Sequence, residues 1–131
     1  GCVRWEHASG LADFPGVPVL ASPDSLDYLQ TATPPAVLPS QFRHPIDWQP
    51  LQFEPRPYLG HGQSLDVFGD GQLVLVPLTE HGAVGLYLTL ADGRRFFFRG
   101  DREQGSAPQG VAALRDADIQ AALGFYPRWV Q

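Results

Sequence analysis

The first seven residues hold a dense group of side chains that could do chemistry. Cys2, Glu6 and His7 bring a thiol, a carboxylate and an imidazole, which are the ligand types that zinc takes in proteins. Arg4 lies among them, and it cannot ligate a metal because its guanidinium stays protonated at any ordinary pH. These residue types at this spacing could contribute ligands to a metal site in which Arg4 takes no part.

This loop resembles the metal-ligand loop of metallo-β-lactamase-fold hydrolases, which reads His-x-His-x-Asp-His and continues into a small-residue turn and often a short helical turn. Cys2 and Arg4 stand on the first two histidine positions. Glu6 stands on the aspartate and His7 on the last histidine. The following run, Ala8–Phe14, fits the family's spacing without a gap. The frame of the loop is retained, while most of its ligands differ.

A second segment is similar to the family's Gly-Asp-Gly hairpin and to the turn that follows it. Asp66–Gly71 leads into the apolar run Leu73–Pro77 and then into Thr79–Gly85. In the family this turn reads Gly-His-Thr-Pro-Gly, and its histidine is the third ligand of the first metal. His81 matches that histidine, while Glu80 replaces the glycine before it.

A third segment, Phe96–Asp101, is similar to the family strand that ends in Gly-Asp. The aspartate at that place bridges two metals in the family, so Asp101 is the matching position. Gln109–Val111 also has a counterpart, in the loop that leads to a helix in lactonase-like members. The resemblance therefore covers most of the chain from the metal-ligand loop onward, and it rests on the order and spacing of the pieces together.

The resemblance implies zinc-dependent hydrolysis of a lactone, ester, thioester or β-lactam, in which paired metal ions hold a hydroxide and polarise the carbonyl. The metal ligands that it implies are Cys2, Glu6, His7, His81 and Asp101, and the catalytic residues are Glu6 and Asp101. No histidine follows His81, so the family's final ligand has no match. We expect one zinc site at most, formed by Cys2, His81 and Asp101 or by Glu6, His7 and Asp101, or none. Activity on a small ester or lactone should be weak or absent, and whether the chain is an enzyme is left open.

Each candidate ligand also has a plain structural explanation. Cys2 can be an incidental thiol, and His7 can hold the loop by hydrogen bonds. His81 can be an inherited position without metal, and Asp101 can be a turn or cap residue. His44 and His61, in proline- and glycine-rich segments, match no ligand position, and we expect both at the surface.

Arg4 is expected to point into the vacated first metal site. There it would pair with Glu6 and Asp101, because unpaired carboxylates in a partly buried cleft are costly and a guanidinium can neutralise them. The alternative is an arginine that extends into solvent from the start of the chain.

The elements that must position these residues follow from apolar patterning between turn signals. Helices are predicted at 22–30, with Ser22 as N-cap and Pro23 at the first helical position, and at 109–123. Asp92-Gly93 predicts a hairpin turn of the two-residue type. Residues 31–57 are rich in proline and predict an irregular connection. Strands are predicted at 17–21, 51–54, 64–68, 72–77, 84–90 and 94–99.

Two strands are apolar without alternation, at Leu73–Val76 and Phe96–Phe98. Such runs indicate strands that are covered on both faces. The predicted fold class is α/β, with a mostly antiparallel sheet and two main helices. By the resemblance, it is equivalent to the C-terminal part of an αββα metallo-β-lactamase sandwich.

Composition narrows the classes of function further. The 131 residues are 44% hydrophobic, which allows one core and predicts a single domain over 1–131, although by the resemblance a partial one. The net charge of −5 argues against a nucleic-acid partner, because such binding needs a basic face. No apolar run approaches the roughly 20 residues that span a bilayer, so no membrane association is expected. A single cysteine excludes an internal disulfide and leaves the compartment open, with the cytoplasm favoured.

The resemblance also bears on partners. The family needs two sandwiched halves, the ligand loop lies near their middle, and this chain begins at that loop and holds no methionine. We expect an N-terminal half to be missing, by the way the chain was made, by processing or by gene decay. A half sandwich leaves an apolar face open, so a second copy or a separately supplied N-terminal half is expected to cover it. The alternative function is a non-catalytic structural or protein-interaction module.

Overall fold

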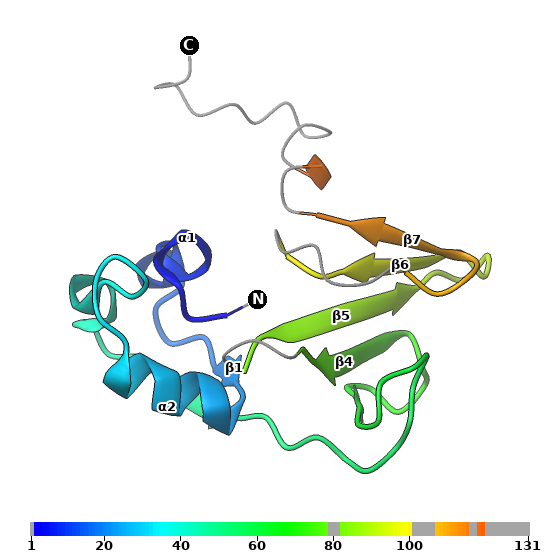
Figure 1. The fold of residues 1–131 in the computed structure, drawn as a ribbon, viewed down its shortest axis with the longest axis horizontal. Coiled ribbons are helices and arrows are strands. Elements are labelled where there is room, and N and C mark those ends of the chain that lie inside the picture. The colour runs from blue at the N-terminus through cyan, green and yellow to red at the C-terminus, as the bar shows by residue number, and fades with distance from the viewer. Residues whose placement is uncertain (1, 79–81, 101–106, 116–117, 120–131) are drawn as a thin grey trace. The chain divides into compact units, whose positions relative to one another are not determined.

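The computed structural model describes residues 2–78, 82–100, 107–115 and 118–119. They form an α/β fold with two α-helices, a mostly antiparallel sheet of five strands and a small parallel sheet of two (Figure 1). The predicted fold class is therefore confirmed. Its equivalence to part of an αββα sandwich stays a prediction.

By its internal contacts the chain divides into two compact units, which are described separately. The first contains residues 1–54 and 77–84, and the second contains residues 55–76 and 85–131. The prediction of a single domain over residues 1–131 stays a prediction.

The first unit begins with α1 (Trp5–Ala8) and a 3₁₀ turn at Leu11–Asp13. β1 (Val19–Ala21) and α2 (Pro23–Thr31) follow, which confirms the strand and the helix predicted at 17–21 and 22–30. A further 3₁₀ turn lies at Pro39–Phe42. No helix in the described part of the chain is long and apolar enough to cross a membrane.

The start of α2 is set by its cap. The Ser22 hydroxyl accepts a hydrogen bond from the Ser25 N–H at 3.1 Å, which satisfies one of the free donors of the first turn. Pro23 fits the next position because no partner is needed there for the N–H that it lacks. This is the cap that the sequence predicts.

β2 (Trp48–Pro50) pairs in parallel with β1, with Val19 opposite Trp48 and Ala21 opposite Pro50. The strand predicted at 51–54 is wrong in position, because the strand ends at Pro50. Leu51 adds one bond, from its N–H to the Ala21 carbonyl at 2.8 Å. Neighbouring residues of a strand point their backbone nitrogens to opposite sides. Because the Leu51 N–H faces β1, the nitrogen of Pro50, which has no hydrogen to donate, faces away from β1.

The buried apolar residues of the first unit come from separate parts of the chain. They are at most 6% exposed and comprise Val3, Ala8, Ala21, Val37 and Leu51. Two of them, Val3 and Ala8, lie within and at the end of the predicted metal-ligand loop, so packing in the protein interior holds that loop at two points.

The five-stranded sheet supplies the core of the second unit. Its order is β3 (Leu65–Asp66), β4 (Leu73–Pro77), β5 (Val84–Thr89), β6 (Arg95–Phe98) and β7 (Val111–Leu114). β3 with β4 and β5 with β6 are antiparallel, whereas β7 runs parallel to β6. Figure 1 shows β4, β5, β6 and β7 side by side.

Two turns of this sheet lie where the sequence predicts them. Before β4, the Asp66 carboxylate accepts the N–H groups of Gly69 and Gly71 at 3.0 and 2.8 Å. Between β5 and β6 the turn contains three residues, 91–93, and not two. The Gly93 N–H donates to the Leu90 carbonyl at 2.9 Å, and Gly93 has φ +87°, which a residue with a side chain adopts only with strain.

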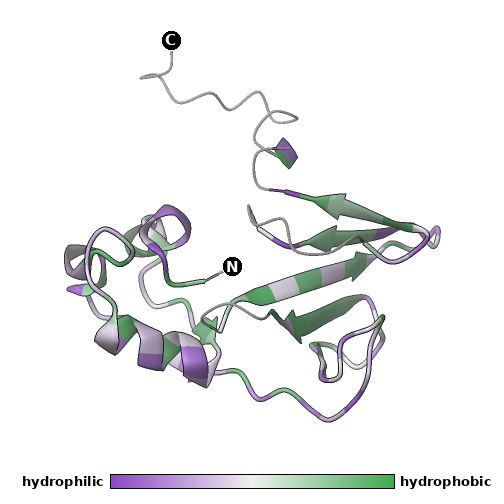
Figure 2. Ribbon diagram, in the orientation of Figure 1, coloured by the Kyte–Doolittle hydropathy of each residue, from purple (hydrophilic) through white to green (hydrophobic). Residues whose placement is uncertain are grey.

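β4 is buried on both of its faces. The consecutive residues Val74, Leu75 and Val76 are at most 9% exposed, and the strand is hydrophobic in colour along its length (Figure 2). This agrees with the prediction made from its unbroken apolar run.

The helix predicted at 109–123 is wrong in its first part. Val111–Leu114 is β7, with Phe96 opposite Ala112 and Phe98 opposite Leu114. Alanine and leucine favour a helix when isolated, but pairing with the aromatic strand β6 overrides that preference. Asp118 and Ile119 have helical backbone, while residues 116–117 and 120–123 lie outside the described residues.

Candidate functional site

The loop that carries Cys2, Glu6 and His7 is held by its backbone and by its ends. Val3 and Ala8 are 5% and 4% exposed. The Trp5 N–H donates to the Ala36 carbonyl at 3.1 Å, and the Arg4 carbonyl accepts the Ala8 N–H at 3.1 Å. The single turn of α1 thus presents the side chains of the loop from a backbone that packing and hydrogen bonds have already placed.

Arg4 and Glu6 form an ion pair inside this loop. The Arg4 Nε donates to Glu6 Oε1 at 2.7 Å, and the two side chains are 27% and 31% exposed. The hydrogen bond to Glu6 raises the pKa of Arg4. Partial burial acts to raise the pKa of Glu6, but hydrogen bonds from its own backbone N–H and from Arg4 outweigh burial and lower it. Both side chains are therefore charged and bonded to each other, which confirms the predicted contact of Arg4 with Glu6. Its predicted pairing with Asp101 and its place in a vacated metal site stay predictions, because Asp101 lies outside the described residues.

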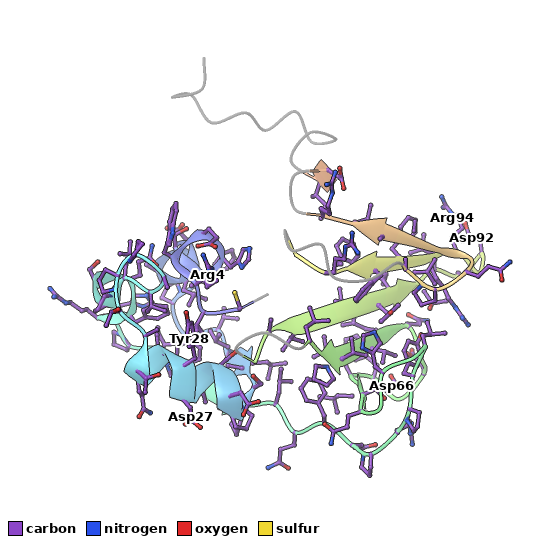
Figure 3. The ribbon with its side chains drawn as sticks, in the orientation of Figure 1. Arg4, Asp27, Tyr28, Asp66, Asp92 and Arg94 are labelled. Carbon is purple, nitrogen blue, oxygen red and sulfur yellow. The ribbon has the colours of Figure 1, made fainter. Side chains whose placement is uncertain are left out.

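Cys2 and His7 form the second pair of the loop. The Cys2 Sγ lies 3.1 Å from Nδ1 of His7. Partial burial acts to raise the pKa of Cys2, but the hydrogen bond with His7 and one at the backbone of Arg4 lower it below its ordinary value. Figure 3 labels Arg4, in the loop that both pairs share. The side chains of Cys2, Arg4, Glu6 and His7 thus contact one another in two pairs.

The predicted metal ligands are only partly brought together. His81 and Asp101 lie outside the described residues, so their places in a site stay predictions. Within residues 2–78, 82–100, 107–115 and 118–119, no group of three or more Cys, His, Asp or Glu side chains is arranged to hold a metal ion. The chemistry of the loop is also unsuited to a metal ion at Arg4, because a guanidinium has no lone pair to donate.

A contact that sequence reasoning missed lies beside the segment that carries His81. The Gly82 carbonyl accepts two hydrogen bonds, from Ser22 Oγ at 2.6 Å and from Ser25 Oγ at 2.8 Å. Both serines are nearly buried, at 6% and 3% exposed. The capping role of Ser22 is readable from the sequence, but nothing in the sequence shows that its hydroxyl also reaches a residue 60 positions later.

His61 lies in an aromatic cluster of the second unit and is half-buried there. Its Nε2 is 3.1 Å from the Tyr87 hydroxyl, and Tyr87 is 1% exposed. Tyr87 stacks on Phe97 with ring centroids 4.2 Å apart, and Tyr58 meets it edge-on at 5.3 Å. Burial raises the pKa of Tyr87. The hydroxyl buried there needs a partner, and His61 supplies one.

A tight turn sets the spacing of this cluster. Tyr58 and His61 exchange two backbone hydrogen bonds, both 2.8 Å long. Between them, Leu59 has φ +43° and Gly60 has φ +87°. Two successive positive φ values are typical of the hairpin turn that twists with its strands, and this turn places both rings against Tyr87.

Comparison with known proteins adds no relative. No protein-family model, curated protein or solved structure matches this chain.

Proposed function

We propose that this chain is a relative of the metallo-β-lactamase-fold hydrolases in which the metal site has degenerated, so that hydrolysis is weak or absent. The order and spacing of its three family-like segments support the relationship. The observation that carries the degeneration is the 2.7 Å ion pair between Arg4 and Glu6. It joins the residues on a histidine position and on the aspartate position of the loop to each other.

The residues present fit a dinuclear zinc centre poorly. A guanidinium carries no lone pair for a metal and brings a positive charge to the place of a cation. Glu6 in place of aspartate moves the carboxylate by on the order of 1 Å, whereas ligand distances tolerate about 0.2 Å. Intact relatives would use zinc to hydrolyse a lactone, ester, thioester or β-lactam, and we derive no step through zinc for this chain.

Restoring the family's ligands tests this proposal. The triple variant Cys2→His/Arg4→His/Glu6→Asp, loaded with zinc, should hydrolyse an aryl ester or a lactone measurably faster than the parent. Replacing His44, which matches no ligand position, with glutamine in the triple variant should leave that gain intact. A triple variant that stays folded and gains no hydrolysis would contradict the proposed relationship. A parent whose zinc-dependent activity rivals that of the triple variant would contradict the degeneration.

The alternative is a non-catalytic structural or interaction module, and exposed apolar side chains favour it. In the first unit Phe14, Val17 and Leu20 are 63%, 51% and 51% exposed. Its partner would be a second copy of this chain. A stoichiometric transition metal in protein purified without added metal favours the hydrolase. Since the degenerate hydrolase is also expected to hold little metal, the triple variant decides when the parent holds none: zinc-dependent hydrolysis gained by that variant favours the hydrolase relative, and none gained favours the module.

A further inference from the structure

We infer that the loop of residues 2–8 is closed by its own side chains in place of a metal, with Arg4 as the resident cation of Glu6 and with Cys2 bonded to His7. The inference rests on the proposed function for the meaning of these positions. It adds to that proposal a statement about what the loop does now, namely that it is formed and stable without zinc and takes none up.

The first argument is charge. A metal ion at this place would neutralise nearby carboxylates, and a guanidinium at 2.7 Å from Glu6 does the same without one. A second cation would have to displace Arg4 from Glu6 or lie beside it. Since like charges in close proximity repel, zinc binding to Glu6 would cost the existing ion pair before it gained anything.

The second argument is the pairing of the remaining donors. Cys2 Sγ and His7 Nδ1 are 3.1 Å apart. Two atoms that both ligate one zinc ion at about 2.0–2.3 Å with tetrahedral angles are more than 3 Å apart, so this distance alone does not exclude zinc. Among the described residues, no group of three or more Cys, His, Asp or Glu side chains is arranged to hold a metal ion, so the described loop offers zinc this pair of donors and a carboxylate that is already bonded to Arg4.

The third argument is that the backbone does not need a metal to hold it. Val3 and Ala8 are buried at the two ends of the loop, and the Trp5 N–H is bonded to the Ala36 carbonyl at 3.1 Å. In small metal-organised domains, the free energy of metal binding is the free energy of folding. In this loop, burial and hydrogen bonds supply the free energy of folding, so the loop should keep its conformation when zinc is withheld.

A zinc titration of four proteins tests this inference by affinity and by melting temperature, without any assay of activity. They are the parent, Arg4→Gln, Arg4→His and the triple variant Cys2→His/Arg4→His/Glu6→Asp. Arg4→Gln is the matched control, because it removes the cation and adds no imidazole. The parent and Arg4→Gln should bind zinc weakly, and neither zinc nor a chelator should move the melting temperature of the parent. Arg4→His should bind more tightly than Arg4→Gln, and the triple variant at least about tenfold more tightly than the parent.

Further outcomes separate this inference from the proposed function. A parent that purifies with one zinc ion, and loses it in Cys2→Ala, would overturn the closed loop while strengthening the relationship to zinc hydrolases. A triple variant that binds no zinc would refute the idea that the loop keeps the geometry of a metal site.

A double-mutant cycle of Arg4→Gln and Glu6→Gln measures the coupling between Arg4 and Glu6. Each single variant should lower the melting temperature by roughly 2 °C, and the double variant by less than the sum. Additive losses would refute the closed loop.

Discussion

Gly82 is a glycine for two separate reasons. Its φ is +70°, in the left-handed region that a side chain makes unfavourable. A Cβ atom there would also collide with the Ser25 nitrogen and the Ser22 hydroxyl, and would lie 2.8 Å from the Asp24 carbonyl carbon. Two of these three contacts are backbone atoms of the first turn of α2, which cannot rotate away.

Gly82→Ala should therefore lower the free energy of unfolding by about 3 kcal/mol, because strain and overlap combine. Gly69→Ala is the matched control. Gly69 has φ +74° and open space around its Cα, so only strain of about 1 kcal/mol is expected. Urea unfolding measures both. Equal losses in the two variants would show that the contact of Gly82 with Ser22 and Ser25 does not form.

Cys2 should react as a thiolate at lower pH than an ordinary cysteine. Its pKa is lowered by the contact with His7 against the opposing effect of burial, and the thiolate is the nucleophile. As the pH falls, reactivity is lost at the pKa of the thiol, so the midpoint of alkylation by iodoacetamide should lie lower in the folded protein than in urea. Replacing His7 with alanine should raise that midpoint.

Mass spectrometry of alkylated protein across a pH series provides this measurement. His44→Ala is the control for loss of an imidazole elsewhere, and it should leave the midpoint unchanged. A folded midpoint equal to the one in urea would contradict the Cys2–His7 contact.

At the scale of elements, β7 allows a direct test of strand against helix. The Arg99 N–H donates to the Leu114 carbonyl, so Leu114 and Ala112 point their backbone groups at β6 while Ala113 points its N–H outward. Ala112→Pro should therefore cost about 3 kcal/mol, and Ala113→Pro clearly less. Urea midpoints compare the two variants. In a helix interior, both proline variants would lower the free energy of unfolding by similar amounts. Similar losses would therefore contradict the strand.

The sequence predicts elements best where local signals are strong. Ser22 followed by Pro23 places the start of α2, and Asp92-Gly93 places the hairpin before β6. The strand Val111–Leu114 could not be predicted, because its Ala-Ala-Leu run favours a helix locally and only pairing with β6 decides otherwise. The end of β2 at Pro50 is likewise set by its pairing with β1.

In the candidate site, too, a contact between residues near in sequence is predicted and contacts between distant residues are not. The contact of Arg4 with Glu6 is expected from the resemblance of the loop, which sets the two residues in one place, and the structure has it. Contacts over long separations are different. Neither the Ser22 bond to Gly82 nor the His61 bond to Tyr87 leaves a trace in the local sequence, because burial and distance along the chain decide them together.

At the scale of the whole molecule, exposed apolar side chains suggest association. Phe14 and Leu20 are 63% and 51% exposed, and Phe68 is 71% exposed. We expect a homodimer or larger assembly that buries at least about 1,000 Å². Light scattering should give a mass that is a multiple of 14.4 kDa, and the double variant Phe14→Ser/Leu20→Ser should shift it toward the monomer. Gln30→Ser, on an exposed polar residue, should not. A monomer at high concentration would contradict the assembly.

The division of the chain into two units falls within β4 and β5. Residues 77–84, at one end of β4 and β5, belong to the first unit, and the remainder of both strands belongs to the second. During synthesis on the ribosome, residues 1–54 emerge well before Gly82, whose carbonyl accepts from Ser22 and Ser25. The first unit is therefore incomplete until the hairpin end has been made. The hydrogen bonds from Ser22 and Ser25 to Gly82 therefore complete the first unit only after residues 55–76, which belong to the second unit, have been synthesised.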